Sequence, residues 1–240
     1  PDCLEQRVYA ASQEPDRDFV IFPMLMFRLR IDDMKLLWNI DSDEDDLSRI
    51  LYGDAICQGT GTLWKRESFI RAGLWDEGLR LWQDVELHIR SLLMGMTYAK
   101  RMDMSPDVYL RISYVSISRT GFHSPEKLES RIQVLCGTMD RMQSRGWVDR
   151  YRGALRHLFT DIFFSAANGG HFMHASGLLT LESEWGLFTQ TARRLLQAYR
   201  MMRRLRLYKF NYLSTRLTER IRTFGPQRQS NIGRIKYLSP

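Results

Sequence analysis

A carboxylate at the predicted start of a helix is the group in this sequence best placed to do chemistry. Apolar residues recur with helical spacing over residues 84–94, which puts Asp84 in the first turn. Backbone amides and the helix dipole keep a carboxylate there ionised and oriented. Such a group accepts a proton from a bound hydroxyl as a general base. Asp is also a preferred capping residue, so spacing alone leaves both roles open for Asp84.

Several elements must hold this carboxylate in place. Ser124-Pro125-Glu126 combines a hydroxyl, a proline and an acid, which predicts a helix start and a helical pattern from there onward. The fold class is therefore α/β over residues 1–122 and α-helical over 123–240. Turn residues and apolar periodicity predict a helix over residues 4–12, one buried strand over 19–28, an acidic loop and short helix over 41–51, a strand over 55–64, a helix over 65–72, a turn over 73–77, and further helices over 147–167 and 171–181.

Three motifs follow one another before and at this carboxylate. They are Gly59-Thr60-Gly61-Thr62-Leu63-Trp64-Lys65-Arg66-Glu67, Ala72-Gly73-Leu74-Trp75-Asp76-Glu77, and Gln83-Asp84-Val85-Glu86-Leu87 with Arg90. In this order and spacing they resemble the latter half of family 2 glycosyltransferases, which have the GT-A fold. Tyr109-Leu110-Arg111-Ile112 and Ser116-Ile117-Ser118 resemble the run that closes the catalytic domain of that family.

The resemblance implies a specific activity and a specific role for Asp84. Residues 1–122 would be the second half of a GT-A glycosyltransferase domain, on the acceptor side, and 123–240 a helical, basic C-terminal region. The enzyme would move a sugar from a nucleotide-diphosphate-sugar donor to a saccharide or lipid-linked acceptor. Inversion at the anomeric carbon, with Asp84 as base, comes from the resemblance only. The missing initiator methionine and the similarity of residues 1–10 to the segment after an Asp-x-Asp motif suggest an excised piece, inactive alone, with the donor-binding half upstream.

Residues around Asp84 are candidate substrate ligands. Gln83 and Glu86 would orient a loop or the acceptor, although a solvated helix face explains them as well. Arg90 either contacts a phosphate or pairs with Glu86 one turn earlier. Trp82 offers an aromatic face to an acceptor sugar, and Gly59 opens the small-residue motif beside the substrate. Trp75 is better explained by packing under the loop.

The resemblance also implies a divalent cofactor, Mg²⁺ or Mn²⁺, whose ligands lie mostly upstream of this chain. Ser113 stands where many family members place a metal-binding histidine, and His123 lies too far along to replace it. The acidic residues over 41–46 are interpreted as a solvated loop and helix start. His171 and His174 have no third ligand nearby in sequence. The metal would therefore be held by the upstream Asp-x-Asp motif and water, or by a displaced histidine of this region, or this member is impaired; we assign no residue of the chain as a metal ligand.

The positive charge of the chain is concentrated near its C-terminal end. The net charge is +7, and residues 193–236 hold 13 of the 35 Lys and Arg residues with one acid, Glu219. Apolar residues at helical spacing predict one basic amphipathic helix over 193–224. It would bind an anionic membrane surface, or dock its apolar face on the protein and leave its arginines in water. Nucleic acid is disfavoured because no reading motif accompanies the charge.

Composition limits the class of protein. With 44% hydrophobic residues the chain can bury a core, so it is not a disordered protein, and it has no apolar run of the roughly 20 residues needed to span a bilayer. Three widely spaced cysteines favour a reducing compartment, so we expect a cytoplasmic protein, peripheral at the inner face of the membrane if the tail binds lipid. The alternative to an enzyme is a non-catalytic helical binding module whose basic face contacts a membrane or another partner. A glycoside hydrolase is disfavoured for want of a spaced carboxylate pair.

Overall fold

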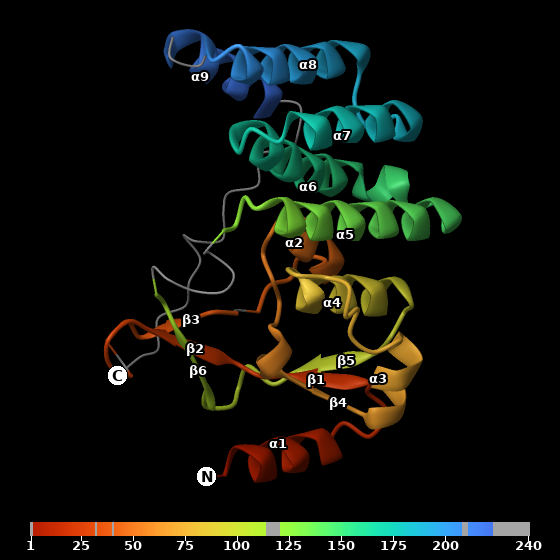
Figure 1. The fold of residues 1–240 in the computed structure, drawn as a ribbon. Coiled ribbons are helices and arrows are strands. Elements are labelled where there is room, and N and C mark those ends of the chain that lie inside the picture. The colour runs from red at the N-terminus through yellow and green to blue at the C-terminus, as the bar shows by residue number, and fades with distance from the viewer. Residues whose placement is uncertain (1, 32, 40, 114–120, 208–210, 223–240) are drawn as a thin grey trace. The chain divides into compact units, whose positions relative to one another are not determined.

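The structure is a computed structural model of the chain (Figure 1), and it describes residues 2–31, 33–39, 41–113, 121–207 and 211–222. Within these ranges the fold is mixed α/β, as expected, with nine α-helices and two small three-stranded sheets. The described residues form two compact units. We call residues 2–78 with 82–113 the α/β unit, and residues 79–81 with 121–222 the helical unit.

The α/β unit contains four helices and all the described strands. Its helices are α1 (Cys3–Ser12), α2 (Asp46–Leu51), α3 (Arg66–Ala72) and α4 (Gln83–Leu93), with a 3-10 turn at Gly59–Gly61. Its strands are β1 (Phe19–Ile21), β2 (Met24–Phe27), β3 (Leu36–Leu37), β4 (Thr62–Trp64), β5 (Tyr98–Lys100) and β6 (Val108–Arg111).

One sheet of this unit has a helix on each face. Its strand order is β4-β1-β5, with β1 antiparallel to β4 and parallel to β5, so that Val20 pairs with Leu63 and Ala99. Figure 1 shows α1 and α4 on opposite sides of this sheet. Ala10 of α1 packs against Val20 on one face, and on the other the ring of His88 from α4 lies 6.1 Å from that of Phe19. The sheet therefore positions α4 and the carboxylate at its start.

The predicted strand over residues 19–28 is wrong in one respect, because it is two strands in two sheets. Pro23 separates β1 from β2, and proline has no amide hydrogen to donate to a ladder. Beyond it, β2 lies between β3 and β6 in the second sheet. The buried side chain of Asn39 bridges the break: Nδ2 donates to the carbonyls of Phe22 and Ile56, and Oδ1 accepts from the amide of Met24.

The predicted strand over residues 55–64 is also too long. Only Thr62–Trp64 is extended in a sheet, and Gly59–Gly61 forms the 3-10 turn before it. A close approach explains the glycine at 61, because a Cβ there would lie 2.6 Å from the sulfur of Met24. The small residues of this motif thus make a tight turn over the start of β2.

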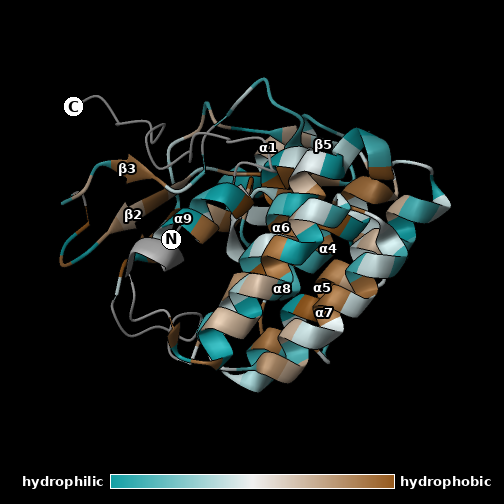
Figure 2. Ribbon diagram, turned by 90° about the horizontal axis from the view of Figure 1, so that it is seen from above, coloured by the Kyte–Doolittle hydropathy of each residue, from teal (hydrophilic) through white to brown (hydrophobic). Residues whose placement is uncertain are grey.

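Five helices make up most of the helical unit, and each packs on the next in the chain. They are α5 (Pro125–Ser144), α6 (Val148–Asn168), α7 (Phe172–Trp185), α8 (Gln190–Arg204) and α9 (Asn211–Arg222). The predicted start of α5 is confirmed: Ser124 is its N-cap and its hydroxyl accepts from the amide of Lys127. Leu135, Leu155 and Phe159 are fully buried between the helices, and hydrophobic and hydrophilic stretches alternate along them (Figure 2).

The prediction of one basic helix over residues 193–224 is wrong. The segment forms α8 and α9 as separate helices, and α8 ends at Arg204. Arg206, just beyond this end, has a left-handed backbone with φ 58°, which cannot continue a right-handed helix. No helix among the described residues has the length and apolar character needed to cross a membrane.

Candidate functional site

Three residues from three different motifs meet at the start of α4. A Cβ built on Gly59 would lie 3.3 Å from Cη2 of Trp75 and 4.0 Å from Cβ of Asp84. Gly59 lies in the 3-10 turn, Trp75 in the turn after α3, and Asp84 in the first turn of α4. The sequence motifs that were singled out for their order therefore also converge in space, and we call this group the Asp84 site.

The backbone that leads into α4 is strained at Trp82. This residue is the N-cap of α4 and has φ 67° and ψ 27°, the left-handed region that a large side chain rarely adopts. No side chain caps the helix at this position. Residues held in such conformations gather at functional sites, where the surrounding structure maintains them. The left-handed conformation of Trp82 changes the direction of the backbone directly before Asp84.

Asp84 is not the N-cap of the helix, but its side chain binds one of the free amides of the first turn. It is the second residue of α4, is half-buried, and its Oδ1 accepts a hydrogen bond of 2.9 Å from the amide of Val85. The carboxylate therefore binds a first-turn amide with one oxygen, which fixes its orientation at the start of the helix.

A buried histidine one turn further along α4 faces the sheet. His88 is 2% exposed, and its Nε2 lies 3.4 Å from the hydroxyl of Thr62. Burial lowers the pKa of His88, and the nearby charge of Asp84 opposes this effect without reversing it. His88 is thus neutral at pH 7 and ties α4 to β4. It was not among the candidates from the sequence, although its i, i+4 spacing from Asp84 was a usable signal.

Arg90 is bound on both sides by groups of the protein. Its Nε and Nη2 donate to the carboxylate of Glu86 at 2.9 and 2.8 Å, and Nη2 also donates to the carbonyl of Leu74 at 2.7 Å. Of the two roles considered for Arg90, the pairing with Glu86 is present. The guanidinium also holds the turn that carries Trp75. Gln83 is exposed at the start of the same helix.

The turn at Gly73 depends on this arginine and on its own glycine. Gly73 has φ 95°, and a Cβ there would lie 2.6 Å from Nη1 of Arg90. Leu74 follows with φ 61°, so two consecutive residues are left-handed. Trp75 then contacts Phe69 edge to face at 5.8 Å and remains 40% exposed. Trp75 therefore packs on Phe69, as expected, while part of the residue stays exposed.

A side chain of α1, Arg7, holds the glycine turn at residues 59–61 in place. Arg7 is buried and forms an ion pair with Asp107 in which Nε and Nη2 each lie 2.6 Å from a carboxylate oxygen. Its Nη1 donates to the carbonyl of Thr60 at 2.8 Å. Burial alone would raise the pKa of Asp107, but the hydrogen bonds from Arg7 and Cys3 and the charge of Arg7 hold it below its usual value. The turn beside Asp84 is therefore attached to a rigid ion pair.

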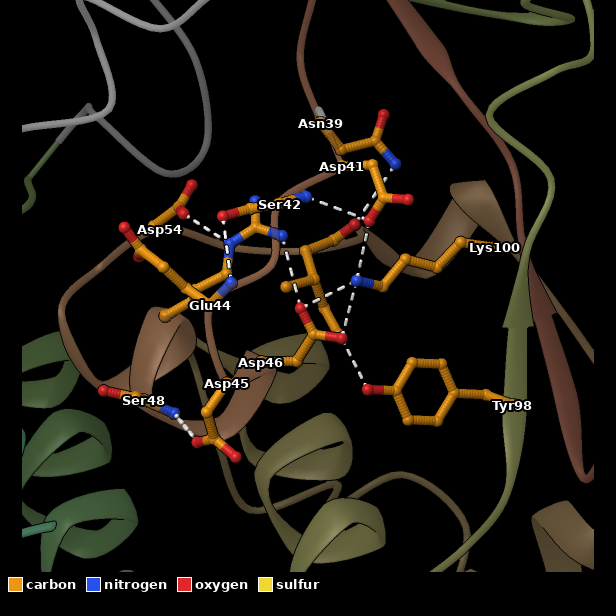
Figure 3. A network of polar contacts seen from close by, with 12 residues as sticks. Asn39, Asp41, Ser42, Glu44, Asp45, Asp46, Ser48, Asp54, Tyr98 and Lys100 are labelled. Carbon is orange, nitrogen blue, oxygen red and sulfur yellow. Dashed lines mark hydrogen bonds and ion pairs between the residues drawn. The ribbon is translucent and has the colours of Figure 1, made fainter.

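A second network of polar contacts surrounds the acidic segment 41–46 and the start of α2 (Figure 3). Asp46, at the start of α2, accepts from the hydroxyl of Tyr98 at 2.5 Å and from Nζ of Lys100 at 2.8 Å. It also pairs with the buried Arg49 at 3.2 Å. The interpretation of residues 41–46 as a solvated loop is thus wrong for Asp46, which is buried, whereas Asp45 does cap α2 as expected.

The histidines at the helical end of the chain are engaged with neighbours in the helical unit. His123 Nδ1 lies 2.7 Å from the hydroxyl of Ser165, and His171 Nε2 lies 2.5 Å from the carbonyl of His123. His174 Nε2 lies 3.4 Å from a carboxylate oxygen of Glu129. In the part of the chain that the structure describes, no group of three or more His, Cys, Asp or Glu residues is arranged to hold a metal ion.

Comparisons with family models, with curated proteins and with solved structures find no match to this chain. The resemblance to family 2 glycosyltransferases therefore stays a prediction from the motifs. The Asp84 site brings the half-buried Asp84 and the 40% exposed Trp75 together around Gly59, whose missing side chain lets the indole pack closely against the turn. An exposed aromatic side chain and a carboxylate are groups that can contact a ring-shaped polar ligand, the first by stacking and the second as a hydrogen-bond acceptor.

Proposed function

We propose that the α/β unit is the acceptor-side half of an inverting glycosyltransferase and that Asp84 is its catalytic base. The observation that carries this proposal is the convergence of Gly59, Trp75 and Asp84. Each belongs to a different motif of the family resemblance, and the three lie together at the start of α4.

In the proposed reaction, Asp84 accepts the proton of an acceptor hydroxyl as that oxygen bonds to the anomeric carbon of the donor sugar. The bond from the sugar to the nucleoside diphosphate breaks, and the diphosphate leaves with the electron pair. A general base in this position contributes about 10²- to 10⁴-fold to the rate. The amide of Val85 helps to hold the carboxylate in a fixed orientation before the proton arrives.

The neighbours of Asp84 receive supporting roles in this proposal. Trp82 was expected to stack on the acceptor, but it is half-buried with a left-handed backbone, and the proposal instead gives the stacking role to Trp75, which is 40% exposed. Glu86 and Arg90 position the turn that carries Trp75 through their ion pair. Gln83 is exposed beside the carboxylate and is the candidate hydrogen-bonding partner of the acceptor.

The donor and the cation belong to the rest of the proposed enzyme. We infer that a preceding segment of a longer protein binds the nucleotide-diphosphate sugar and Mg²⁺ or Mn²⁺. Bound there, the cation would neutralise the charge of the leaving diphosphate. On this proposal the protein acts in the cytoplasm, and residues 1–240 alone transfer no sugar.

A second candidate function is a non-catalytic binding module that uses the basic face of the helical unit. The observation in its favour is the set of exposed arginines on and after α8, which include Arg194, Arg204 and Arg206. A module of this kind needs neither a donor nor a base, so the two functions predict different results when Asp84 is changed.

The test uses the longer protein with Asp84→Asn, a change that keeps the shape of the side chain and removes its basicity. Glu77→Gln, at an exposed acid before the site, is the matched control. Transfer is measured across a panel of nucleotide sugars with Mg²⁺ or Mn²⁺, and donor binding is measured separately. We expect Asp84→Asn to lose at least about 100-fold in transfer with donor binding retained, and Glu77→Gln to keep both.

Other outcomes would count against the proposal. Unchanged transfer in Asp84→Asn would remove Asp84 from the mechanism. Absence of donor binding in the unaltered protein would favour the binding module. Turnover of a nucleotide sugar by residues 1–240 alone would contradict the division of the site between two segments.

A further inference from the structure

Helix α8 is docked on the helical unit through its apolar face and through several of its arginines. Ala192, Leu196, Tyr199 and Met202 are buried. The inward arginines are bound as well. Arg193 lies 3.3 Å from a carboxylate oxygen of Glu182, Arg200 donates to the hydroxyl of Ser176, and Arg203 donates to the carbonyl of Asn168 at 3.3 Å. The apolar face of this helix is therefore not available to an external partner.

The C-terminal end of α8 has a different composition of exposed groups. Met201, Leu205 and Leu207 are 42%, 58% and 44% exposed, and Arg204 and Arg206 are exposed among them. We call residues 201–207 the α8 tip. Three long apolar side chains and two cations thus share seven residues on the surface of the helical unit, where a helix facing only water would carry polar groups.

Charge and apolar character together define the partner that fits this surface. No acidic residue lies between Glu184 and Glu219, so the tip lies in the most basic part of the chain. An anionic partner is attracted by the arginines, but a nucleic acid binds through its phosphates and by stacking its bases on aromatic side chains, whereas the tip carries only aliphatic and thioether side chains beside its arginines. The headgroup region of an anionic bilayer accepts both, because hydrocarbon lies a few ångströms below the charged groups.

We propose that the α8 tip binds the surface of an anionic phospholipid membrane, with Met201, Leu205 and Leu207 inserted between headgroups and with Arg204 and Arg206 on their phosphates. The helix contacts the membrane with its C-terminal end, because its apolar side is occupied by the protein. This inference concerns the helical unit and does not depend on the sugar transfer proposed for Asp84.

The test measures partition of the 240-residue chain onto phosphatidylcholine vesicles with and without phosphatidylserine. The charge variant is Arg204→Gln with Arg206→Asn; asparagine is chosen because the φ of 58° at 206 is left-handed. The apolar variant is Met201→Gln with Leu205→Gln and Leu207→Gln. The control replaces two exposed arginines elsewhere in the helical unit, Arg145→Gln and Arg150→Gln, so that net charge falls by the same amount.

We expect binding to vesicles that contain phosphatidylserine and little binding to phosphatidylcholine alone. The charge variant should bind about 30-fold more weakly, from roughly fivefold per arginine near an anionic surface. The apolar variant should lose about tenfold or more. The control should stay within about twofold, and Asp84→Asn should bind like the unaltered chain. Circular dichroism establishes that each variant keeps its helices.

Three results would overturn the proposal. The first is no binding of the unaltered chain to vesicles that contain phosphatidylserine. The second is an equal loss in the control, which would make the attraction a property of net charge and not of the tip. The third is tighter binding to a single-stranded oligonucleotide that the charge variant weakens and the apolar variant does not, which would identify nucleic acid as the partner.

Discussion

Replacing Gly61 with alanine should destabilise the α/β unit through a single identifiable contact. The new Cβ would lie 2.6 Å from the sulfur of Met24 and 3.2 Å from its Cγ. Ordinary contacts begin near 3.4 Å, so the sulfur must move by about 0.8 Å, the difference between 3.4 and 2.6 Å. Met24 is fully buried in β2, and its neighbours leave the sulfur little room to move.

The magnitude follows from two opposing effects. Overpacking of a filled core costs about 1–3 kcal/mol. Gly61 does not have a left-handed φ, so alanine is compatible with its backbone and gains about 0.4–1 kcal/mol by restricting the unfolded chain. The expected net loss therefore lies between about 0 and 2.6 kcal/mol, and a loss near the middle of this range, about 1.3 kcal/mol, would lower the melting temperature of a unit of this size by several degrees.

A double-mutant cycle isolates this contact. Met24→Ala alone should cost about 2–5 kcal/mol for the cavity it leaves. In that background Gly61→Ala should cost almost nothing, because the next nearest atom, the carbonyl oxygen of Phe22, lies at an ordinary 3.6 Å. Urea unfolding followed by tryptophan fluorescence suits the measurement, since four of the six tryptophans belong to the α/β unit. Additive costs would refute the steric argument.

Two further predictions concern stability. Gly177→Ala, in the interior of α7 with nothing within 4 Å of the new Cβ, should stabilise the helical unit by about 0.5–1 kcal/mol in urea unfolding, and a loss of stability would show a contact that the structure lacks. Asp107 has a pKa below its usual value, so its ion pair with Arg7 stabilises the fold above about pH 4 and the contribution is lost as pH falls through the lowered folded pKa. Asp107→Asn should therefore reduce stability at neutral pH and much less near pH 2, and an equal loss at both would remove the ion pair as the cause.

Elements whose signals lie within a few residues could be predicted from the sequence. The start of α5 is fixed by Ser124 and Pro125, and α1, α3 and α4 begin and end within about two residues of their predicted bounds. Each of these depends on local periodicity and on capping groups. Strand boundaries failed because apolar runs do not show where a strand changes sheet, and Pro23 was the only sign of that change.

Contacts between distant parts of the chain could not be predicted in the same way. Asp46 reads as one of many acids in a polar loop, and its burial depends on Tyr98 and Lys100, more than 50 residues away. The pairing of Arg7 with Asp107 spans 100 residues. The positions of Asp46 and Arg7 in the sequence do not indicate which residues they bind, because these pairs are brought together only by the fold of the sheet.

The Asp84 site was partly predictable, because the order of the motifs pointed to its members. The sequence singled out Asp84 as the base and Gly59 as a substrate contact, and it favoured packing for Trp75, which packs on Phe69 and remains 40% exposed. It could not foresee the left-handed backbone at Trp82, since tryptophan is among the least expected residues in that conformation. The surrounding fold imposes this geometry against the local preference.

Residues 79–81 belong to the helical unit although they lie within the sequence of the α/β unit, which limits how the two units can be exchanged between proteins. They belong to the helical unit, where the amide of Arg80 donates to the hydroxyl of Ser130 at 2.8 Å, yet they precede Asp84 by only a few positions. The border between the units is consequently crossed more than once along the sequence. Exchange of helical units between two such proteins by a single recombination near residue 120 would leave this tripeptide behind with the wrong partner. The two units are therefore expected to be inherited together, and grafts that succeed should carry residues 79–81 along with the helices.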